Sequence, residues 1–133
     1  MAIIEIDSTA DLTALLRTIL EAKFHDAPND DDVPGSSILA AVANRICDAL
    51  TTAEIQKTGP DAQRRWLEWR ALTPARREWK VAISYATRTW AKKWSRWSER
   101  QKEDAARDLV APLLLTHEGM HLFLEQVRAG LGL

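Results

Sequence analysis

Six tryptophans lie between positions 66 and 97, and the spacing of four of them constrains the fold more than any other feature of the chain. Steps of three and four residues place side chains on one face of an α-helix, which has about 3.6 residues per turn. A stripe with this period is typical of a helix packed on a hydrophobic core. The sequence therefore predicts one long helix from Thr73-Pro74 to about Arg107, with a buried stripe formed by Trp79, Ile83, Ala86, Trp90, Trp94 and Trp97.

The rest of the chain also has hydrophobic residues at helical spacing, with residues typical of helix starts and ends between the segments. In the first segment Leu12, Leu15, Leu16, Ile19 and Leu20 repeat at helical spacing. In the second, one apolar face is predicted from Ile38, Leu39, Val42, Ile46, Ala49 and Leu50. Pro112 lies either in the first turn of the closing helix or at a kink, and residues 2–6 resemble a short strand without a partner. We expect an all-α fold, a compact bundle of four to five helices forming a single domain. Its helices are predicted at residues 9–24, 37–57, 61–72, 74–107 and about 112–129, with an acidic loop at 25–35.

The composition is that of an ordinary globular protein, with 46% hydrophobic and 28% charged residues. The one cysteine, Cys47, cannot form an internal disulfide, and its apolar neighbours predict a buried thiol. No run of about 18 apolar residues is present, and residues 1–7 lack the basic start and apolar stretch of a signal peptide. We therefore expect a cytoplasmic protein without a membrane partner.

Charge is segregated along the chain, although the net charge is only −1. Residues 1–63 carry a net charge of −7, residues 64–107 carry +8 and residues 108–133 carry −2. The acidic segment either neutralises the basic one in the fold or leaves it free for an acidic partner. Within the basic segment, cations spaced by four residues predict a ridge beside the tryptophan stripe. The ridge consists of Arg88, Lys92, Arg96 and Arg100.

Three interpretations of this ridge remain open: a solvated face, a surface for an acidic protein and a track for nucleic-acid phosphates. Helix-turn-helix, zinc-finger and basic-zipper patterns are absent, and the isoelectric point is about 6.3. These features favour a protein partner over a nucleic acid. Arginine and tryptophan are also enriched in binding hot spots, which makes Trp66, Trp69 and Trp97 candidate anchors wherever they are exposed.

The segment His117-Glu118-Gly119-Met120-His121 has the H-E-x-x-H pattern, which on a helix presents two imidazoles and a carboxylate together. With its uncharged and apolar flanks, Leu114 to Phe123 resembles the signature of the zincin metalloproteases. The resemblance implies zinc bound by His117 and His121, with Glu118 polarising a water molecule. It covers about ten residues. Leu124 and Val127 occupy positions where one zincin group has glycine and histidine, and no sheet is predicted.

The third histidine, His25, offers a second arrangement for metal binding. In an antiparallel bundle the end of the first helix can approach the start of the last, bringing His25 near His117 and His121. Such a site is similar to that of DinB-type four-helix bundles. The alternative is that His117 packs at the edge of the core while His121, Glu125 and Arg128 form a polar flank.

Other catalytic patterns, such as a glycine-rich phosphate loop or a nucleophile elbow, are absent. We therefore predict a non-catalytic interaction protein, an inhibitor or adaptor of a larger machine in a microbe or phage. It is expected to bind an acidic partner surface through the basic, tryptophan-rich segment. We expect no cofactor unless the histidine motif binds zinc. The predicted contacts are Arg88, Lys92, Arg96, Arg100, Trp66, Trp69 and Trp97.

Overall fold

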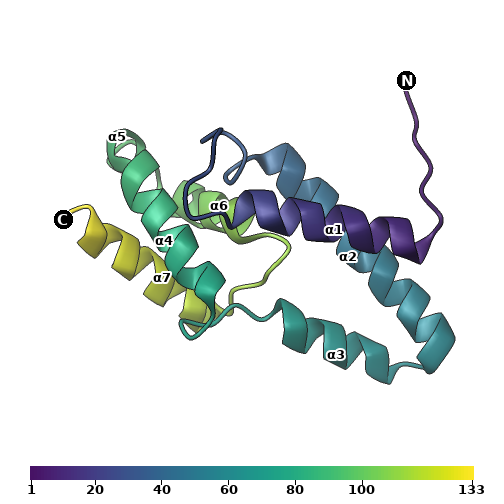
Figure 1. Cartoon of the computed structure of the whole chain (residues 1–133). Helices are drawn as coiled ribbons and strands as arrows, with labels where there is room; N and C mark the ends of the chain where they lie inside the picture. Colours follow the sequence, from purple (N-terminus) through teal and green to yellow (C-terminus); the bar gives the residue numbers. More distant parts are fainter.

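The chain folds into seven helices and no β-strand in the computed structural model, which describes residues 1–133. The all-α class is confirmed. The expected number of four to five helices is wrong, because the segment 74–107 forms three helices instead of one. Residues 2–6 form no strand and extend from the body (Figure 1). The helices are α1 (Thr9–Lys23), α2 (Ser37–Thr58), α3 (Asp61–Arg70), α4 (Arg77–Thr89), α5 (Ala91–Trp94), α6 (Glu99–Val110) and α7 (His117–Gly130).

Helices α1 and α2 begin at serine caps. The hydroxyl oxygen of Ser8 accepts a hydrogen bond from the backbone N–H of Asp11 at 3.4 Å, and that of Ser36 accepts one from Leu39 at 3.1 Å. Gly59 ends α2 with a φ of 96°, a conformation that glycine adopts without a steric penalty. The two helices lie side by side and run in opposite directions (Figure 1).

The predicted long helix is broken at two places. Its first helical residue is Arg77 and not Pro74, and the helix ends at Thr89. After the four-residue α5, a turn leads to Ser98, whose hydroxyl oxygen accepts from the N–H of Gln101 at 3.2 Å. The Gln101 side chain in turn accepts from the N–H of Ser98 at 2.9 Å. This capping box starts a new helix, α6, within the segment expected to be continuous.

Pro112 lies between α6 and α7, so both predicted placements of this proline in a helix are wrong. The Ala111–Pro112 peptide bond is cis. Beyond it, Leu114 donates its N–H to the carbonyl oxygen of Arg70 at 2.7 Å, and Leu72 donates to Leu114 at 2.9 Å. The connection is thereby attached to the segment after α3, which ends at Arg70 and not at Leu72 as predicted.

The larger hydrophobic core lies among α4, α6 and α7 and contains the buried tryptophans. Trp79, Trp90 and Trp94 are buried, as the stripe predicts. The Trp79 ring meets Phe123 edge to face, with ring centroids 5.3 Å apart, and its indole N–H donates to Gln126 at 2.8 Å. The stripe survives the helix breaks because α4, α5 and the following turn, which carries Trp97, all border this core.

A smaller hydrophobic cluster joins α1 to α2 and includes the buried thiol of Cys47, which confirms that prediction. The apolar face predicted for the second segment is confirmed in part: Ile46 and Leu50 are buried, whereas Val42 and Ala49 are exposed and Ile38 is 79% exposed. Helix α2 instead buries Ala43, together with Ala40, because small side chains let neighbouring helices approach closely. No helix combines the length and apolar character that a membrane crossing needs.

Candidate functional site

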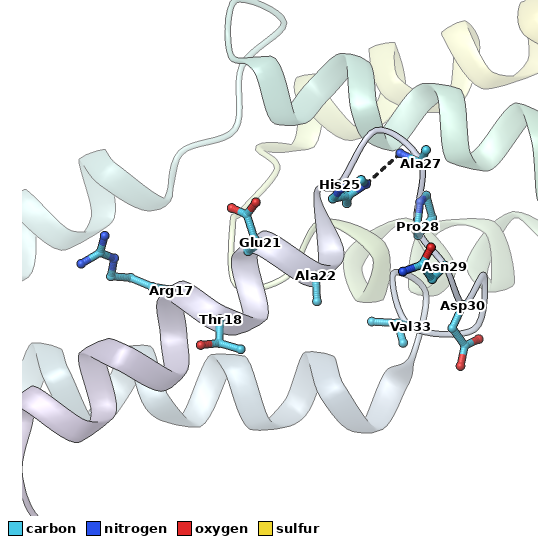
Figure 2. A pocket seen from close by; sticks show the side chains of 10 residues that line it. All are labelled: Arg17, Thr18, Glu21, Ala22, His25, Ala27, Pro28, Asn29, Asp30 and Val33. Atoms are coloured by element: carbon cyan, nitrogen blue, oxygen red, sulfur yellow. Dashed lines mark hydrogen bonds between the residues drawn. The ribbon is translucent and has the colours of Figure 1, made fainter.

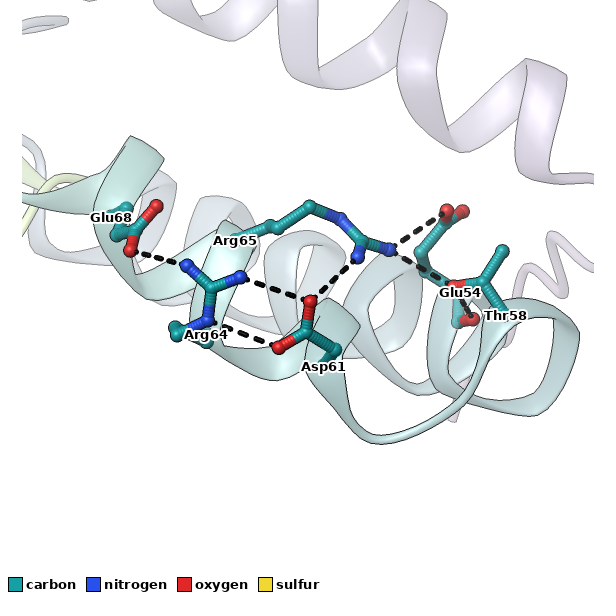
Figure 3. A network of polar contacts seen from close by, with 6 residues as sticks. All are labelled: Glu54, Thr58, Asp61, Arg64, Arg65 and Glu68. Atoms are coloured by element: carbon teal, nitrogen blue, oxygen red, sulfur yellow. Dashed lines mark hydrogen bonds and ion pairs between the residues drawn. The ribbon is translucent and has the colours of Figure 1, made fainter.

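Helix α3 is attached to the end of α2 by a network of exposed charged side chains (Figure 3). The Arg65 guanidinium lies 3.7 Å from the Glu54 carboxylate and donates to the Thr58 hydroxyl at 3.0 Å, both on α2. Arg64 and Arg65 also reach the Asp61 carboxylate, at 2.9 and 3.3 Å. Hydrogen bonding to Arg64 holds the pKa of Asp61 below its usual range. These contacts therefore help to hold α3 in its orientation relative to the end of α2.

Two tryptophans on α3 line a groove that faces α1. Trp66 and Trp69 meet edge to face with ring centroids 5.5 Å apart, which confirms that they face one way. The Arg76 guanidinium lies 5.8 Å from the Trp69 ring centroid and donates to the Trp69 carbonyl. Trp69 remains 38% exposed. We call this feature the α3 groove. It comprises two hollows that share Trp69: one of about 350 Å³ lined by Glu54, Arg65, Trp66 and Trp69, and one of about 330 Å³ where Trp69 and Arg76 face Arg17, Leu20 and Glu21.

The basic residues of the predicted ridge do not lie on one helix. Arg88 is on α4, Lys92 is on α5, Arg96 is in the following turn and Arg100 is on α6. Arg88 is already paired, because its guanidinium lies 3.0 Å from the Asp31 carboxylate of the acidic loop. The single four-residue ridge is therefore a wrong prediction, and its cause is the broken helix.

The three remaining ridge residues and Lys93 lie on α5, the following turn and the start of α6. We call this region the α5 corner and define it as Lys92, Lys93, Arg96 and Arg100. All four are exposed, and none has a carboxylate oxygen within 4.0 Å. The nearby cations differ, because Lys102 pairs with Glu99 at 3.0 Å and Arg107 pairs with Asp104 at 3.1 Å. Unpaired positive charge is thus concentrated at one end of α5.

Tryptophan side chains from the larger core pack next to the α5 corner. Trp90 and Trp97 meet edge to face with ring centroids 5.3 Å apart, and Trp97 is only partly buried. The ammonium group of Lys102 lies 4.4 Å from the centroid of the buried Trp94 ring. Of the three predicted anchors, Trp97 lies by the α5 corner, whereas Trp66 and Trp69 lie in the α3 groove. The predicted single face is therefore divided into two surfaces.

The H-E-x-x-H motif opens α7. The Thr116 hydroxyl caps the helix by accepting from the N–H of Gly119 at 2.9 Å, and His117, Glu118 and His121 are exposed in its first two turns. No group of three or more His, Cys, Asp or Glu side chains lies close enough together to hold a metal ion. Neither a third zincin ligand nor the arrangement with His25 is therefore formed.

His25 lies instead at the rim of a shallow hollow of about 630 Å³ formed by α1 and the following loop (Figure 2). Its Nδ1 accepts a hydrogen bond from the N–H of Ala27 at 3.0 Å. Arg17, Glu21 and Asp30 also line the hollow, but the side chains spread along α1 and the loop and do not converge (Figure 2). Ligand sites place a few polar groups around one point, so this hollow has little of their character.

Two buried cations were missed by the sequence analysis. Lys23 is 1% exposed and donates to the carbonyl oxygens of Pro34 at 3.1 Å and Asp108 at 2.6 Å. Burial lowers the pKa of its ammonium group to about 8, and the charge of Asp108 partly opposes this shift. Arg70 is the other. Lys23 follows Leu16 and Ile19 at helical steps of three and four residues, so it lies on the same buried face of α1. This spacing was the sequence signal for its burial.

No protein-family model matches the chain, and no curated protein or solved structure is detectably similar to it.

Proposed function

We propose that this chain is a non-catalytic interaction protein that binds an acidic surface of a protein partner through the α5 corner. The observation that carries the proposal is the concentration of four exposed cations, none of which has an intramolecular carboxylate partner. From Trp79 to Ser98 the chain contains no acidic residue. The charge of the corner is therefore available to attract and orient a partner of opposite charge.

The support beneath the corner favours binding. Trp90 and Trp94 are buried in the larger core, so the backbone that carries Lys92 and Lys93 is attached to a packed base. A surface that is already ordered loses less conformational entropy when it binds. Trp97, partly exposed beside Arg96, adds an aromatic side chain of the type enriched at binding hot spots.

The charges around the corner favour a protein over a nucleic acid. Asp31 lies 3.0 Å from Arg88, and it belongs to the run Asp30-Asp31-Asp32 on the loop before α2. This acidic loop would repel a continuous phosphate backbone, because DNA carries one charge per about 1.7 Å of helix axis. A protein surface can place carboxylates opposite the corner and neutral or basic groups opposite the loop.

The test compares proteins of the source organism retained by three immobilised forms of the chain. They are the wild type, the double reversal Lys92→Glu with Arg96→Glu, and the matched control Arg45→Glu with Arg128→Glu. The control pair consists of exposed cations without ion pairs, so both variants change the net charge equally. We expect a specific partner to be retained by the wild type and the control and lost by the corner reversal.

Circular dichroism and thermal melting check that both variants remain folded. Equal retention of the partner by the corner reversal and the wild type contradicts the proposal. A parallel titration with duplex DNA tests the alternative. Four phosphate contacts would give a slope of log affinity against log salt of about −3.6, and such a slope in place of protein binding would replace the proposal by a nucleic-acid function.

A further inference from the structure

Residues 1–7 form an apolar arm that makes no hydrogen bond with the body of the molecule. Ile3, Ile4 and Ile6 are exposed, and Ile4 is 88% exposed. None of residues 1–7 makes a backbone or side-chain hydrogen bond. The arm also carries the acidic residues Glu5 and Asp7 and no basic side chain. Three isoleucines in so short an exposed segment indicate a surface that is covered in a complex.

The α3 groove has the chemistry that such a segment needs. In an extended segment, alternate side chains lie on one face, about 6.6 Å apart along the strand, and Ile4 and Ile6 are such a pair. The Trp66 and Trp69 ring centroids are 5.5 Å apart, a similar spacing. Each isoleucine can therefore contact one indole ring, and aromatic rings provide large apolar areas for such contacts.

Charge complements this apolar match. Arg65 and Arg76 in the groove are paired with Glu54 and Glu78, at 3.7 and 3.1 Å. Arg17, at the α1 side of the groove, has no carboxylate within 4.0 Å. The groove also contains Glu21, a carboxylate without an ion pair, so its lining has four arginines and three glutamates. Because the arm brings two carboxylates, docking would place it on a lining of net positive charge.

The arm and the groove do not meet within one chain. Figure 1 shows the arm leaving the start of α1 on the side opposite to α3. The Ser8 cap sets this direction, because its hydroxyl accepts from the N–H of Asp11 and its backbone is extended. The arm can keep this direction when the groove belongs to a second molecule.

We propose that the arm of one copy docks in the α3 groove of a second copy, and that the second arm returns the contact to form a two-fold dimer. Ile4 and Ile6 lie on Trp66 and Trp69 of the second copy, and Glu5 or Asp7 pairs with its Arg17. Two-fold symmetry repeats every contact, which leaves no free arm or groove. This inference does not depend on the α5 corner.

Sedimentation equilibrium and light scattering of the full chain over a concentration series test the dimer. We expect twice the 15.0 kDa chain mass at high concentration. The arm variant Ile4→Asp with Ile6→Asp removes four isoleucine contacts from the two-fold dimer. It should raise the dimer Kd roughly 10,000-fold, since each lost apolar contact weakens binding about tenfold. The control Ile38→Asp changes an exposed isoleucine on α2 and should leave the Kd unchanged.

Mixing two variants identifies the contact. Trp69→Ala removes the groove but keeps the arm, and the arm variant keeps the groove. A mixture of the two has one intact arm–groove pair, so it should form a heterodimer at concentrations where each variant alone is monomeric. The charge swap Glu5→Lys with Arg17→Glu should likewise dimerise better than Arg17→Glu alone. A monomeric wild type, or a dimer that survives the arm variant, overturns the proposal.

Discussion

Arg70 donates its Nε–H to the carbonyl oxygen of Pro112 at 2.7 Å, and this hydrogen bond connects the end of α3 to the segment between α6 and α7. The same guanidinium donates to the side chains of Asn44 at 2.9 Å and Asp48 at 3.3 Å, both on α2. Beside it, the carbonyl oxygen of Arg70 accepts from the N–H of Leu114 at 2.7 Å. One residue therefore connects α2, the end of α3 and the segment between α6 and α7.

Replacing this arginine by an apolar side chain of similar length should destabilise the fold. Arg70→Met removes the hydrogen bonds to Pro112, Asn44 and Asp48 and leaves a carbonyl oxygen near the core without its donor. Hydrogen bonds to a charged group contribute about 1.5–3 kcal/mol each, and those to the exposed carboxylate contribute less. We expect the free energy of unfolding to fall by about 2–4 kcal/mol in urea titrations followed by circular dichroism.

Arg64→Met provides the matched control, because Arg64 makes ion pairs only with the exposed side chains of Asp61 and Glu68. A surface substitution of this kind usually changes stability by no more than about 0.5 kcal/mol. If Arg70→Met and Arg64→Met have equal effects, the connection made by Arg70 does not stabilise the fold.

Burial of Lys23 should make stability rise with pH above about 8. The folded pKa is lowered to about 8 from the ordinary value of 10.5. Between these two values the unfolded chain retains a proton that the folded protein has lost, so raising the pH favours the folded state. From pH 7 to pH 9 this group should add about 1 kcal/mol to the free energy of unfolding.

The measurement is the difference between the wild type and Lys23→Met in urea titrations at pH 7, 8 and 9. Taking the difference removes the opposite contribution of Cys47, whose thiol pKa is raised by burial to about 11. A difference that does not change with pH would mean that the Lys23 ammonium group keeps an ordinary pKa, despite its contact with the carbonyl oxygens of Pro34 and Asp108.

The thiol of Cys47 should be unreactive in the folded protein. It is fully buried, and its raised pKa leaves little thiolate at pH 8. We expect labelling by an aromatic disulfide reagent to be slow and to speed up with urea in step with global unfolding, whereas denatured protein should react at once. Rapid labelling without denaturant would show that α1 and α2 separate locally at the cluster around Cys47.

The parts of the fold that the sequence predicts correctly depend on local signals. Ser8 and Ser36 cap helices through N–H groups three residues away, and a stripe of tryptophans marks a buried face. Lys23 shares the helical spacing of Leu16 and Ile19, but for Lys23 and Arg70 local signals are outweighed, because a charged side chain is usually exposed. Their partners include the carbonyl oxygens of Asp108 and Pro112, which are remote in sequence and brought close only by tertiary packing.

The basic ridge was predicted as continuous because Arg88, Lys92, Arg96 and Arg100 were assigned to one helix. Lys92, Arg96 and Trp97 do share an exposed corner, but Trp66 and Trp69 lie in the separate α3 groove. The break between α5 and α6, within the segment predicted to be one helix, has a local signal. The sequence Ser98-Glu-Arg-Gln101 is a capping box, but the tryptophan period continues across it because the chain on both sides packs on one core.

Ser98→Ala distinguishes a broken helix from a continuous one. Ser98 caps α6 through the N–H of Gln101 at 3.2 Å, so its loss should lower the free energy of unfolding by about 1 kcal/mol. In a continuous helix the same change would stabilise the protein, because alanine is the better helix former. Ser95→Ala is the matched control, since Ser95 is exposed in the same turn and its side chain makes no hydrogen bond. A gain in stability for Ser98→Ala in urea titrations would contradict the helix break. It would support a single helix with a continuous basic ridge.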